Sequence, residues 1–385
     1  MTRTSPPLWA LLLLSLSIAT MSSGGIWFAL LDPTPPLMQA CWRLSLTAAM
    51  QSAGVAYELH TDKALDAAFW RRFRRALPLT LTIGLALAAY FGSWGFSVAH
   101  TSLLDSLLLV CTTPLVLVVI MTLRWLYRRH DSSTQDTMMT QTPSLESSPL
   151  VRKPETVDDD DGVSCATSWF ETIVCPRHAL PPTWMEVLGA TVGFAGVATL
   201  LATTPSSSSI DARHHASLLG NASALVGAVV LIVYLEGCAS SRKWMPLFLY
   251  SFSVTSIGAV ALGLASLVLE SHTTLTGFGP AALLGCFGDG RRLALALGAA
   301  FFAGFFGHAT MNVAIVYVSP LLISVAALSE PLIGSILGYL VGVQGAPDKV
   351  ALVAAPLLLG GALLVTLGGR DVKTKSKLQA TSDAA

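Results

Sequence analysis

The stretch from His308 to Pro331 reads HATMNVAIVYVSPLLISVAALSEP and is apolar almost throughout. It nevertheless contains His308, Asn312 and Glu330, and Pro331 follows Glu330 directly. A buried carboxylate without a partner costs several kcal/mol, and a proline interrupts the hydrogen bonds of a helix. We therefore expect Glu330 to mark a site or a hinge inside a membrane bundle. The alternative is that it caps freed backbone groups or pairs with an arginine.

The composition of the whole chain is that of a membrane protein. Of its 385 residues, 53% are hydrophobic and only 12% are charged, and the mean hydropathy is +0.63. Soluble domains contain about a quarter charged residues. Apolar runs of roughly 20 residues, the length that crosses a bilayer, recur along nearly the whole chain. We predict an all-α polytopic membrane protein. The balance of 23 basic and 23 acidic residues gives no reason to expect nucleic acid as a partner.

Ten transmembrane helices are predicted from these apolar runs. Their approximate ranges are 8–31, 37–57, 76–98, 102–123, 183–203, 216–236, 246–270, 292–314, 319–342 and 349–368. The first run resembles the core of a signal peptide at Leu11 to Leu14, but its apolar character resumes and continues to Leu31. This favours a retained first helix.

Residues 130–181 differ in kind, because Ser, Thr, Pro and acidic residues dominate and Asp158–Asp161 form an acidic run. We expect a disordered cytosolic linker here. The six cysteines form no CxxC pair, and Cys165 and Cys175, which share the linker, have no histidine at zinc-site spacing. We therefore expect no metal, no other cofactor and no structural disulfide.

The basic residues indicate the orientation. When the spans alternate, most lysines and arginines lie on the same side as the N-terminus, including the arginines of 58–75 and the lysines of the tail. Cytoplasmic segments carry an excess of Lys and Arg. We expect an integral multi-pass protein of the plasma membrane or an endomembrane, with both termini in the cytosol.

An internal repeat relates the two halves of the chain. Ser102 lies twelve residues before Pro114, and Ser319 lies twelve residues before Pro331. Five helices per half is an odd number, so the second half enters the membrane with the opposite orientation. Inverted repeats of this kind build transporters. We predict two inverted five-helix repeats, in which Pro114 and Pro331 act as hinges.

The predicted organisation has five parts. They are a first repeat with helices one to four (1–129), the linker (130–181), a fifth helix completing the first repeat (182–204), a second repeat (216–369) and a cytosolic tail (370–385). The similarity of Gly189–Gly196 to Ala354–Gly361 relates the fifth helix to the tenth.

The last three predicted helices resemble the EamA-type repeat of the drug/metabolite transporter superfamily. The residues that carry this resemblance are Gly307-His308, Asn312, Tyr317-Val318-Ser319, Ser329-Glu330-Pro331 and Gly360-Gly361, with Pro36 to Arg43 in the first half. The resemblance implies ten helices in two inverted repeats around a central cavity, and transport of small metabolites such as amino acids or drug-like compounds. Two features depart from the family: the long linker, and Gln344-Gly345 where many relatives carry Gly-Glu.

Six residues are candidates for a solute path: Arg43, Trp94, Asp105, His308, Asn312 and Glu330. At ~1.5 Å per residue, Glu330 lies about 16 Å into its helix, near the middle of a ~30 Å hydrocarbon core. His308 and Asn312 share a helix face with Gly304. Arg43 either pairs with Asp105 or faces the cavity and binds an anionic group such as a carboxylate. Trp94 forms an aromatic wall with Trp42 and Tyr90, or simply packs.

These features together predict a secondary transporter of a small organic metabolite, amino-acid-like or drug-like, that works by alternating access and is not an enzyme. No Walker-type phosphate loop is present, so ATP is not the direct energy source. Glu330 and His308 are the groups able to carry a coupling proton. The expected partners are a small-molecule solute and the lipid bilayer, and a homodimer is compatible with the sequence.

Three other functions stay open. One is a nucleotide-sugar or phosphate-sugar type exchanger of an endomembrane, since the superfamily's eukaryotic relatives include such carriers. Another is an intramembrane lipid-modifying enzyme, for which His214-His215 is the only dense histidine pair. The third is a non-catalytic membrane scaffold that uses the linker as a docking tail.

Overall fold

The computed structural model describes residues 7–62, 65–113, 115–123, 125–127, 183–202, 217–242, 244–314, 317, 327–343, 345–346 and 349–382. Within these ranges the chain is helical, apart from turns and one isolated bridge between Thr274 and Ala282. This agrees with the expected all-α class. The linker predicted at 130–181 and the hinge predicted at Pro114 lie outside the described residues.

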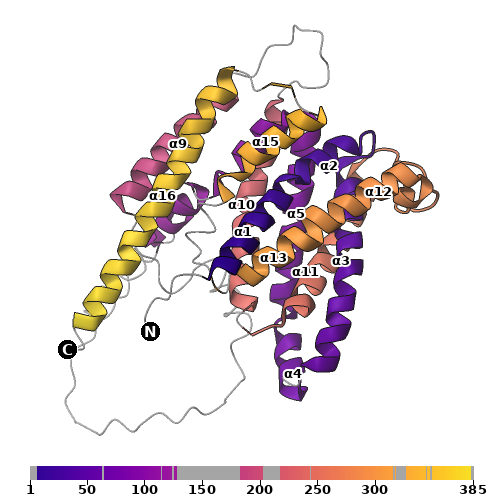
Figure 1. The fold of residues 1–385 in the computed structure, drawn as a ribbon, viewed down its shortest axis with the longest axis horizontal. Coiled ribbons are helices and arrows are strands. Elements are labelled where there is room, and N and C mark those ends of the chain that lie inside the picture. The colour runs from indigo at the N-terminus through magenta and orange to yellow at the C-terminus, as the bar shows by residue number, and fades with distance from the viewer. Residues whose placement is uncertain are drawn as a thin grey trace, which may run out of the picture.

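The described helices form one bundle (Figure 1). The first half contains α1 (Leu8–Ser22), α2 (Gly24–Leu30), α3 (Pro36–Thr61), α4 (Ala67–Arg75), α5 (Leu77–His100), α6 (Leu103–Val110) and α9 (Trp184–Ala202). The second half contains α10 (Leu218–Ser241), α11 (Leu247–Leu269), the 3₁₀ turn η1 (Gly285–Gly288), α12 (Gly290–Gly298), the π-helix η2 (Ala299–Phe306), α13 (Gly307–Ala314), α15 (Glu330–Val341) and α16 (Lys349–Ser382).

The protein is an integral membrane protein by the length and polarity of these helices. Six segments are long and apolar enough to cross a bilayer: Leu8–Leu30, Leu77–His100, Leu103–Tyr127, Leu218–Cys238, Leu247–Leu269 and Gly290–Ala314. Shorter apolar helices cover Trp184–Thr199, Glu330–Val341 and Leu352–Val365. Each of these nine segments overlaps one of the predicted spans. Of the span predicted at 319–342, residues 319–326 lie outside the described residues. The remaining prediction, at 37–57, falls on α3, which is long but more polar.

Several elements differ from the sequence-based expectation. The polar connection at 58–75 is largely helical, because α3 continues to Thr61 and α4 follows from Ala67. The tail expected at 370–385 continues α16 as far as Ser382. The first span is divided at Ser23 between α1 and α2. Short breaks and irregular turns of this kind are visible only once the backbone is placed.

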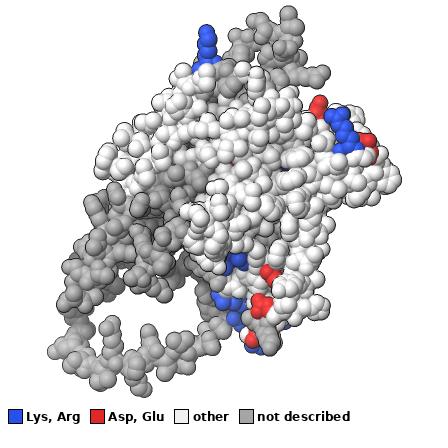
Figure 2. Space-filling view, in the orientation of Figure 1, with Lys and Arg blue, Asp and Glu red and all other residues white. Residues whose placement is uncertain are grey.

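Charged side chains gather at two opposite edges of the molecule, with an uncharged surface between them (Figure 2). At one edge lies α4, which carries Arg71, Arg72, Arg74 and Arg75. At the other lies the start of α12, with Asp289 as its N-cap. The start of α1 and the end of α16 lie toward the α4 edge (Figure 1). The uncharged band between the edges is the surface that faces lipid.

Helices α3 and α11 pack against each other and cap each other's N-terminus. Glu58, near the end of α3, accepts hydrogen bonds from the backbone N–H groups of Phe248 (2.8 Å) and Leu249 (2.8 Å). Glu270, at the end of α11, accepts from those of Leu37 (2.7 Å) and Met38 (3.2 Å).

Both carboxylates supply the N-terminal capping acceptor that the residues next to each helix start do not provide. The N-cap residues are Pro35 for α3 and Pro246 for α11, and neither supplies a side-chain acceptor. A carboxylate at a helix N-terminus satisfies orphan N–H groups and opposes the positive end of the helix dipole. Along α3 the two capped ends lie about 32 Å apart, close to the thickness of a hydrocarbon core.

Helices α9 and α16 form a second close pair, at one side of the bundle (Figure 1). A Cβ atom on Gly361 would lie 2.5 Å from the backbone nitrogen of Gly193, and one on Gly196 would lie 3.0 Å from that of Leu358. Only glycine permits this approach, as in other small-residue helix contacts in membranes. The stretches that resembled each other in sequence thus lie on two helices in contact.

Removing either cap charge should weaken the α3–α11 pair. We expect Glu58→Gln and Glu270→Gln each to lower the free energy of unfolding by about 1–2 kcal/mol, because charge-assisted bonds to N–H groups become neutral ones. The two effects should add, since the sites are far apart. Thermal unfolding of the purified protein in detergent measures both. Asp32→Asn, which changes an exposed carboxylate near the Glu270 end, is the control. A double variant as stable as the control would contradict this account.

Candidate functional site

A stripe of polar side chains runs along one face of α3. Gln39, Arg43, Thr47 and Gln51 recur every four residues, the spacing that places side chains on one helix face. Each is almost fully buried, with exposed fractions of 5%, 4%, 3% and 4%. The polar stripe, as we call these four residues, extends about 18 Å along the helix. It faces the interior of the bundle, which explains why α3 is central although it is less apolar than its neighbours.

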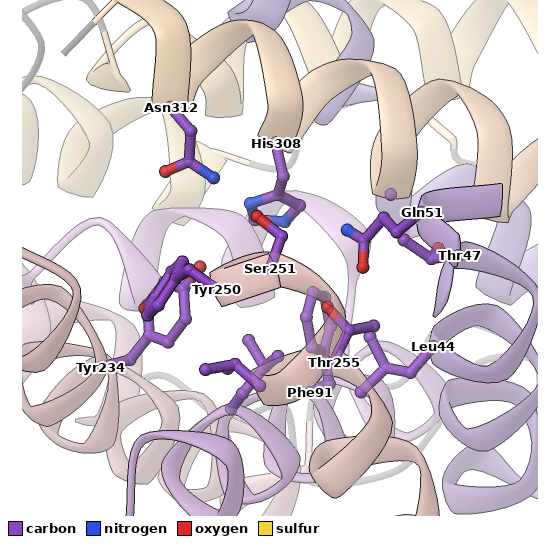
Figure 3. Close-up of a pocket in the computed structure, with 13 residues that line it drawn as sticks. Leu44, Thr47, Gln51, Phe91, Tyr234, Tyr250, Ser251, Thr255, His308 and Asn312 are labelled. Carbon is purple, nitrogen blue, oxygen red and sulfur yellow. The ribbon is translucent and has the colours of Figure 1, made fainter. Parts of the chain in front are cut away.

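The Gln51 end of the polar stripe opens on a cavity inside the bundle (Figure 3). Its lining comes from α3, α5, α10, α11, η2 and α13, and consists of Leu44, Thr47, Gln51, Leu87, Phe91, Tyr234, Tyr250, Ser251, Val254, Thr255, Gly304, His308 and Asn312. The cavity volume is about 20 Å³, which holds about one water molecule. The space around the polar centre is therefore small in this conformation.

The wall opposite α3 is the face predicted from the sequence. Gly304, His308 and Asn312 all line the cavity. Thr47 donates a hydrogen bond to the carbonyl of Ala300 (3.1 Å), and the Thr47 side chain occupies the position that a Cβ on Gly304 would need. A π-helical segment at this point is typical of functional sites. The glycine and the wide turn let η2 approach the polar stripe closely.

Arg43 lies against aromatic rings beside the cavity. Its guanidinium carbon is 4.5 Å from the centroid of the Phe91 ring and 5.8 Å from that of the Trp94 ring. Its Nε and Nη1 atoms are buried without a hydrogen-bond partner among the described residues. The ion pair with Asp105 that the sequence allowed therefore does not hold these two nitrogens. Phe91 lines the cavity on one side and contacts Arg43 on the other.

The energetics of Arg43 favour a functional role. Burying an ion costs several kcal/mol, and each buried donor left without an acceptor costs about 1–3 kcal/mol. Contacts with two aromatic rings recover about 2 kcal/mol each at most. The contacts seen in the folded protein therefore do not offset the free-energy cost of burying the Arg43 guanidinium.

Trp94 forms an aromatic wall next to Arg43. Its ring stacks on Tyr90, with centroids 6.4 Å apart and planes at 4°, and meets the edge of Phe28 at 5.3 Å. The Trp94 Nε1 donor is buried and has no partner among the described residues. Trp42, by contrast, donates to the carbonyl of Leu283 (2.8 Å) and so ties α3 to the loop before α12. Its role is packing.

Asp105 and Glu330 lie away from the cavity. Asp105 is buried in the first turn of α6, where its backbone N–H donates to the Ser102 hydroxyl (3.0 Å). Glu330 is the first residue of α15 and is half-buried, within electrostatic reach of Tyr90. Both carboxylates stand at helix N-termini, where negative charge is favourable. Pro331 follows in the first turn of α15, so it begins a helix there.

Arg242 provides a contrast to Arg43. It is the C-cap of α10, where a positive charge is favourable, and its Nη1 donates to the carbonyl of Met245 (2.5 Å). Partial burial lowers the pKa of Arg242 from its usual value. Its Nε has no partner among the described residues, as in Arg43, but its Nη1 is bonded whereas Nη1 of Arg43 is not.

Comparisons with known proteins establish the fold alone. No family model and no curated protein matches the sequence. A solved structure described only as "Crystal structure of protein" superposes with a TM-score of 0.51 at 15% identity, over 93% of this chain and 97% of that one. Most of the chain thus has the overall fold of an experimental structure. The resemblance to the EamA-type repeat stays a prediction.

The cavity contains residues that the sequence analysis did not single out. The most informative are Thr47 and Gln51 of the polar stripe, with Gln39 above them. Their four-residue spacing with Arg43 was readable in the sequence as a signal. The contributions of Tyr234 from α10 and Ser251 from α11 carry no such signal, because they depend on which helices meet.

The stability of an Arg43→Met variant separates the two interpretations of Arg43. Methionine fills a similar volume without a charge, so if the guanidinium has no structural partner, stability should stay unchanged or rise by about 1–3 kcal/mol. Thermal unfolding in detergent measures it, with Arg242→Met as the matched variant that should be destabilised. A loss of about 3 kcal/mol or more at Arg43 would show that this residue has a structural partner.

Proposed function

We propose that the protein is a secondary transporter that moves a small organic solute across the membrane by alternating access. The observation that carries this proposal is the polar stripe of α3, which lines an otherwise apolar bundle with buried, incompletely paired groups and ends in a small cavity with polar side chains. A protein that only spans the membrane gains nothing from such groups, because polar side chains inside a bilayer are costly. In a transporter, the solute would be the hydrogen-bonding partner of these buried groups.

The packing pattern supports an inverted repeat as the basis of the mechanism. Counting ten spans, the second and seventh are α3 and α11, which cap each other reciprocally at equivalent N–H groups. The fifth and tenth, α9 and α16, also pair with each other. The first packs on the eighth as the sixth packs on the third, through α1 with α13 and α10 with α5. This is the set of contacts that a two-fold relation between oppositely inserted halves would generate.

Interrupted helices around the cavity support movement between the halves. The first span breaks at Ser23, the fourth at Cys111, and α15 begins at Glu330. Gly334 of α15 lies against the backbone of Ser22 at the first of these breaks. Discontinuous helices of this kind let one part of a transporter bundle rock against another. We propose that these breaks act as the hinges that open the cavity.

We also propose the orientation and the family. The α4 edge is placed in the cytosol because it carries four neighbouring arginines, and the described chain ends nearest the termini lie on the same side. The EamA-type repeat is proposed as the family on the sequence resemblance. An amino-acid-like or drug-like solute is the substrate we favour over a nucleotide sugar, because the only arginine among the cavity and stripe residues is Arg43.

Filling the cavity should abolish transport without unfolding the protein. Ser251 lines the cavity, whereas Leu264 lies on the same helix with 61% of its surface exposed toward lipid. We expect Ser251→Phe to reduce solute flux at least about tenfold, because the aromatic ring occupies the space the solute needs. Leu264→Phe also introduces a larger aromatic side chain, but on the lipid face. This variant should keep the flux of the unaltered protein.

The measurement is uptake into proteoliposomes of a mixture of amino acids, aromatic acids, amines and nucleotide sugars, quantified by mass spectrometry. The proposal expects at least one solute to accumulate above protein-free vesicles. Accumulation of none of these classes would remove the transport assignment. Equal flux in Ser251→Phe and Leu264→Phe would show that the solute does not pass through this cavity.

A further inference from the structure

Three buried hydrogen-bond donors lie on two neighbouring side chains beside the cavity, and none has an acceptor among the described residues. They are Nε and Nη1 of Arg43 and Nε1 of Trp94, and the guanidinium carbon of Arg43 lies 5.8 Å from the Trp94 ring. Arg43 is 4% exposed and Trp94 is 5% exposed, so bulk water does not satisfy them. A group that completes this cluster has to bring acceptor oxygens and no donors.

The charge of the cluster restricts the ligand further. Arg43 is the only lysine or arginine within α3, α5, η2 and α13, the helices that meet at this point. One guanidinium matches a single negative charge, such as that of a carboxylate, to which it gives charge-assisted hydrogen bonds. A phosphate monoester, with nearly two charges and three acceptor oxygens, would leave charge uncompensated in a low-dielectric site.

The surrounding walls indicate the rest of the ligand. Phe91 and Trp94 flank the guanidinium, and Tyr90 and Phe28 extend the aromatic surface from Trp94. Phe91 separates Arg43 from the cavity and contacts His308 at 6.0 Å between ring centroids. A rotation of the Phe91 side chain would connect the two spaces, so that a ligand entering through the cavity reaches the guanidinium.

We infer that Arg43 and Trp94 form a binding site for the carboxylate of an organic monoanion with an aromatic or apolar body. The carboxylate accepts from Nη1 of Arg43 and from Nε1 of Trp94, while the body packs on Phe91 and Tyr90. This inference rests on the proposed transport function for the route by which the anion arrives. The binding step itself is measurable without transport.

The test uses 3-phenylpropionate as the probe and its neutral amide, 3-phenylpropionamide, as the matched comparison. Isothermal titration of the full-length purified protein in detergent gives the affinity for each. We expect the carboxylate to bind at least about 30-fold more tightly than the amide, and Arg43→Gln to abolish this difference. Arg43→Lys should retain part of it, since the charge stays but the guanidinium is lost. Arg242→Gln, at an arginine engaged elsewhere, should leave both affinities unchanged.

A second variant keeps the inference testable if Arg43→Gln does not fold. Trp94→Phe preserves the aromatic wall and removes only the Nε1 donor, so carboxylate affinity should fall about tenfold while amide affinity stays the same. Equal binding of carboxylate and amide to the unaltered protein, or carboxylate binding that ignores both substitutions, would overturn the inference. Transport of neutral solutes alone would then still be compatible with the proposed function. Arg43-dependent carboxylate binding without any flux would instead remove the transporter and keep the site.

Discussion

The burial of the Arg43 guanidinium, two of whose nitrogens have no acceptor among the described residues, is the constraint on which the arrangement depends. Arg43 cannot face lipid, so α3 must lie inside the bundle with its polar stripe turned inward. The neighbouring helices then have to pack around the polar stripe. They do so with small or hydroxyl-bearing residues such as Gly304, Ser251 and Thr255. The cavity is the space left where the polar stripe meets the π-helical segment η2. The central place of the most polar span thus follows from its charge.

The ends of α3 are governed by a different requirement, that of orphan backbone N–H groups in a medium without water. Prolines start α3 and α11, so neither helix caps itself, and each takes a carboxylate from the other. Two antiparallel helices tied at both ends make a firm central pair. Movement is then left to the interrupted elements around them, where α1 meets α2 at Ser23 and α15 begins at Glu330. In the proposed mechanism the α3–α11 pair stays rigid, and the interrupted helices around it move.

Much of the fold was predictable from the sequence, because apolar runs of bilayer length identify membrane spans without knowledge of tertiary contacts. The face shared by Gly304, His308 and Asn312 was also predictable, since helical periodicity alone determines it. The polar stripe was missed because Arg43 was considered singly, although the same periodicity applies to Gln39, Thr47 and Gln51. The caps of Glu58 and Glu270 join residues about two hundred positions apart, and no local pattern announces such contacts. Glu330, which the sequence predicted to mark a site or a hinge, lies at the start of α15 and does not line the cavity.

The central claim is that the cavity opens alternately to the two sides of the membrane. A single cysteine at Ser251, in a background with the six native cysteines replaced, tests it most directly in oriented proteoliposomes. Membrane-impermeant thiol reagents are applied from one side or the other, with Leu264→Cys on the lipid face as the control. The account predicts that the cysteine at position 251 is modified by reagent applied from either side. A bound solute that holds the cavity closed should protect this cysteine from modification. Modification from neither side, or from one side only under every condition, would contradict it.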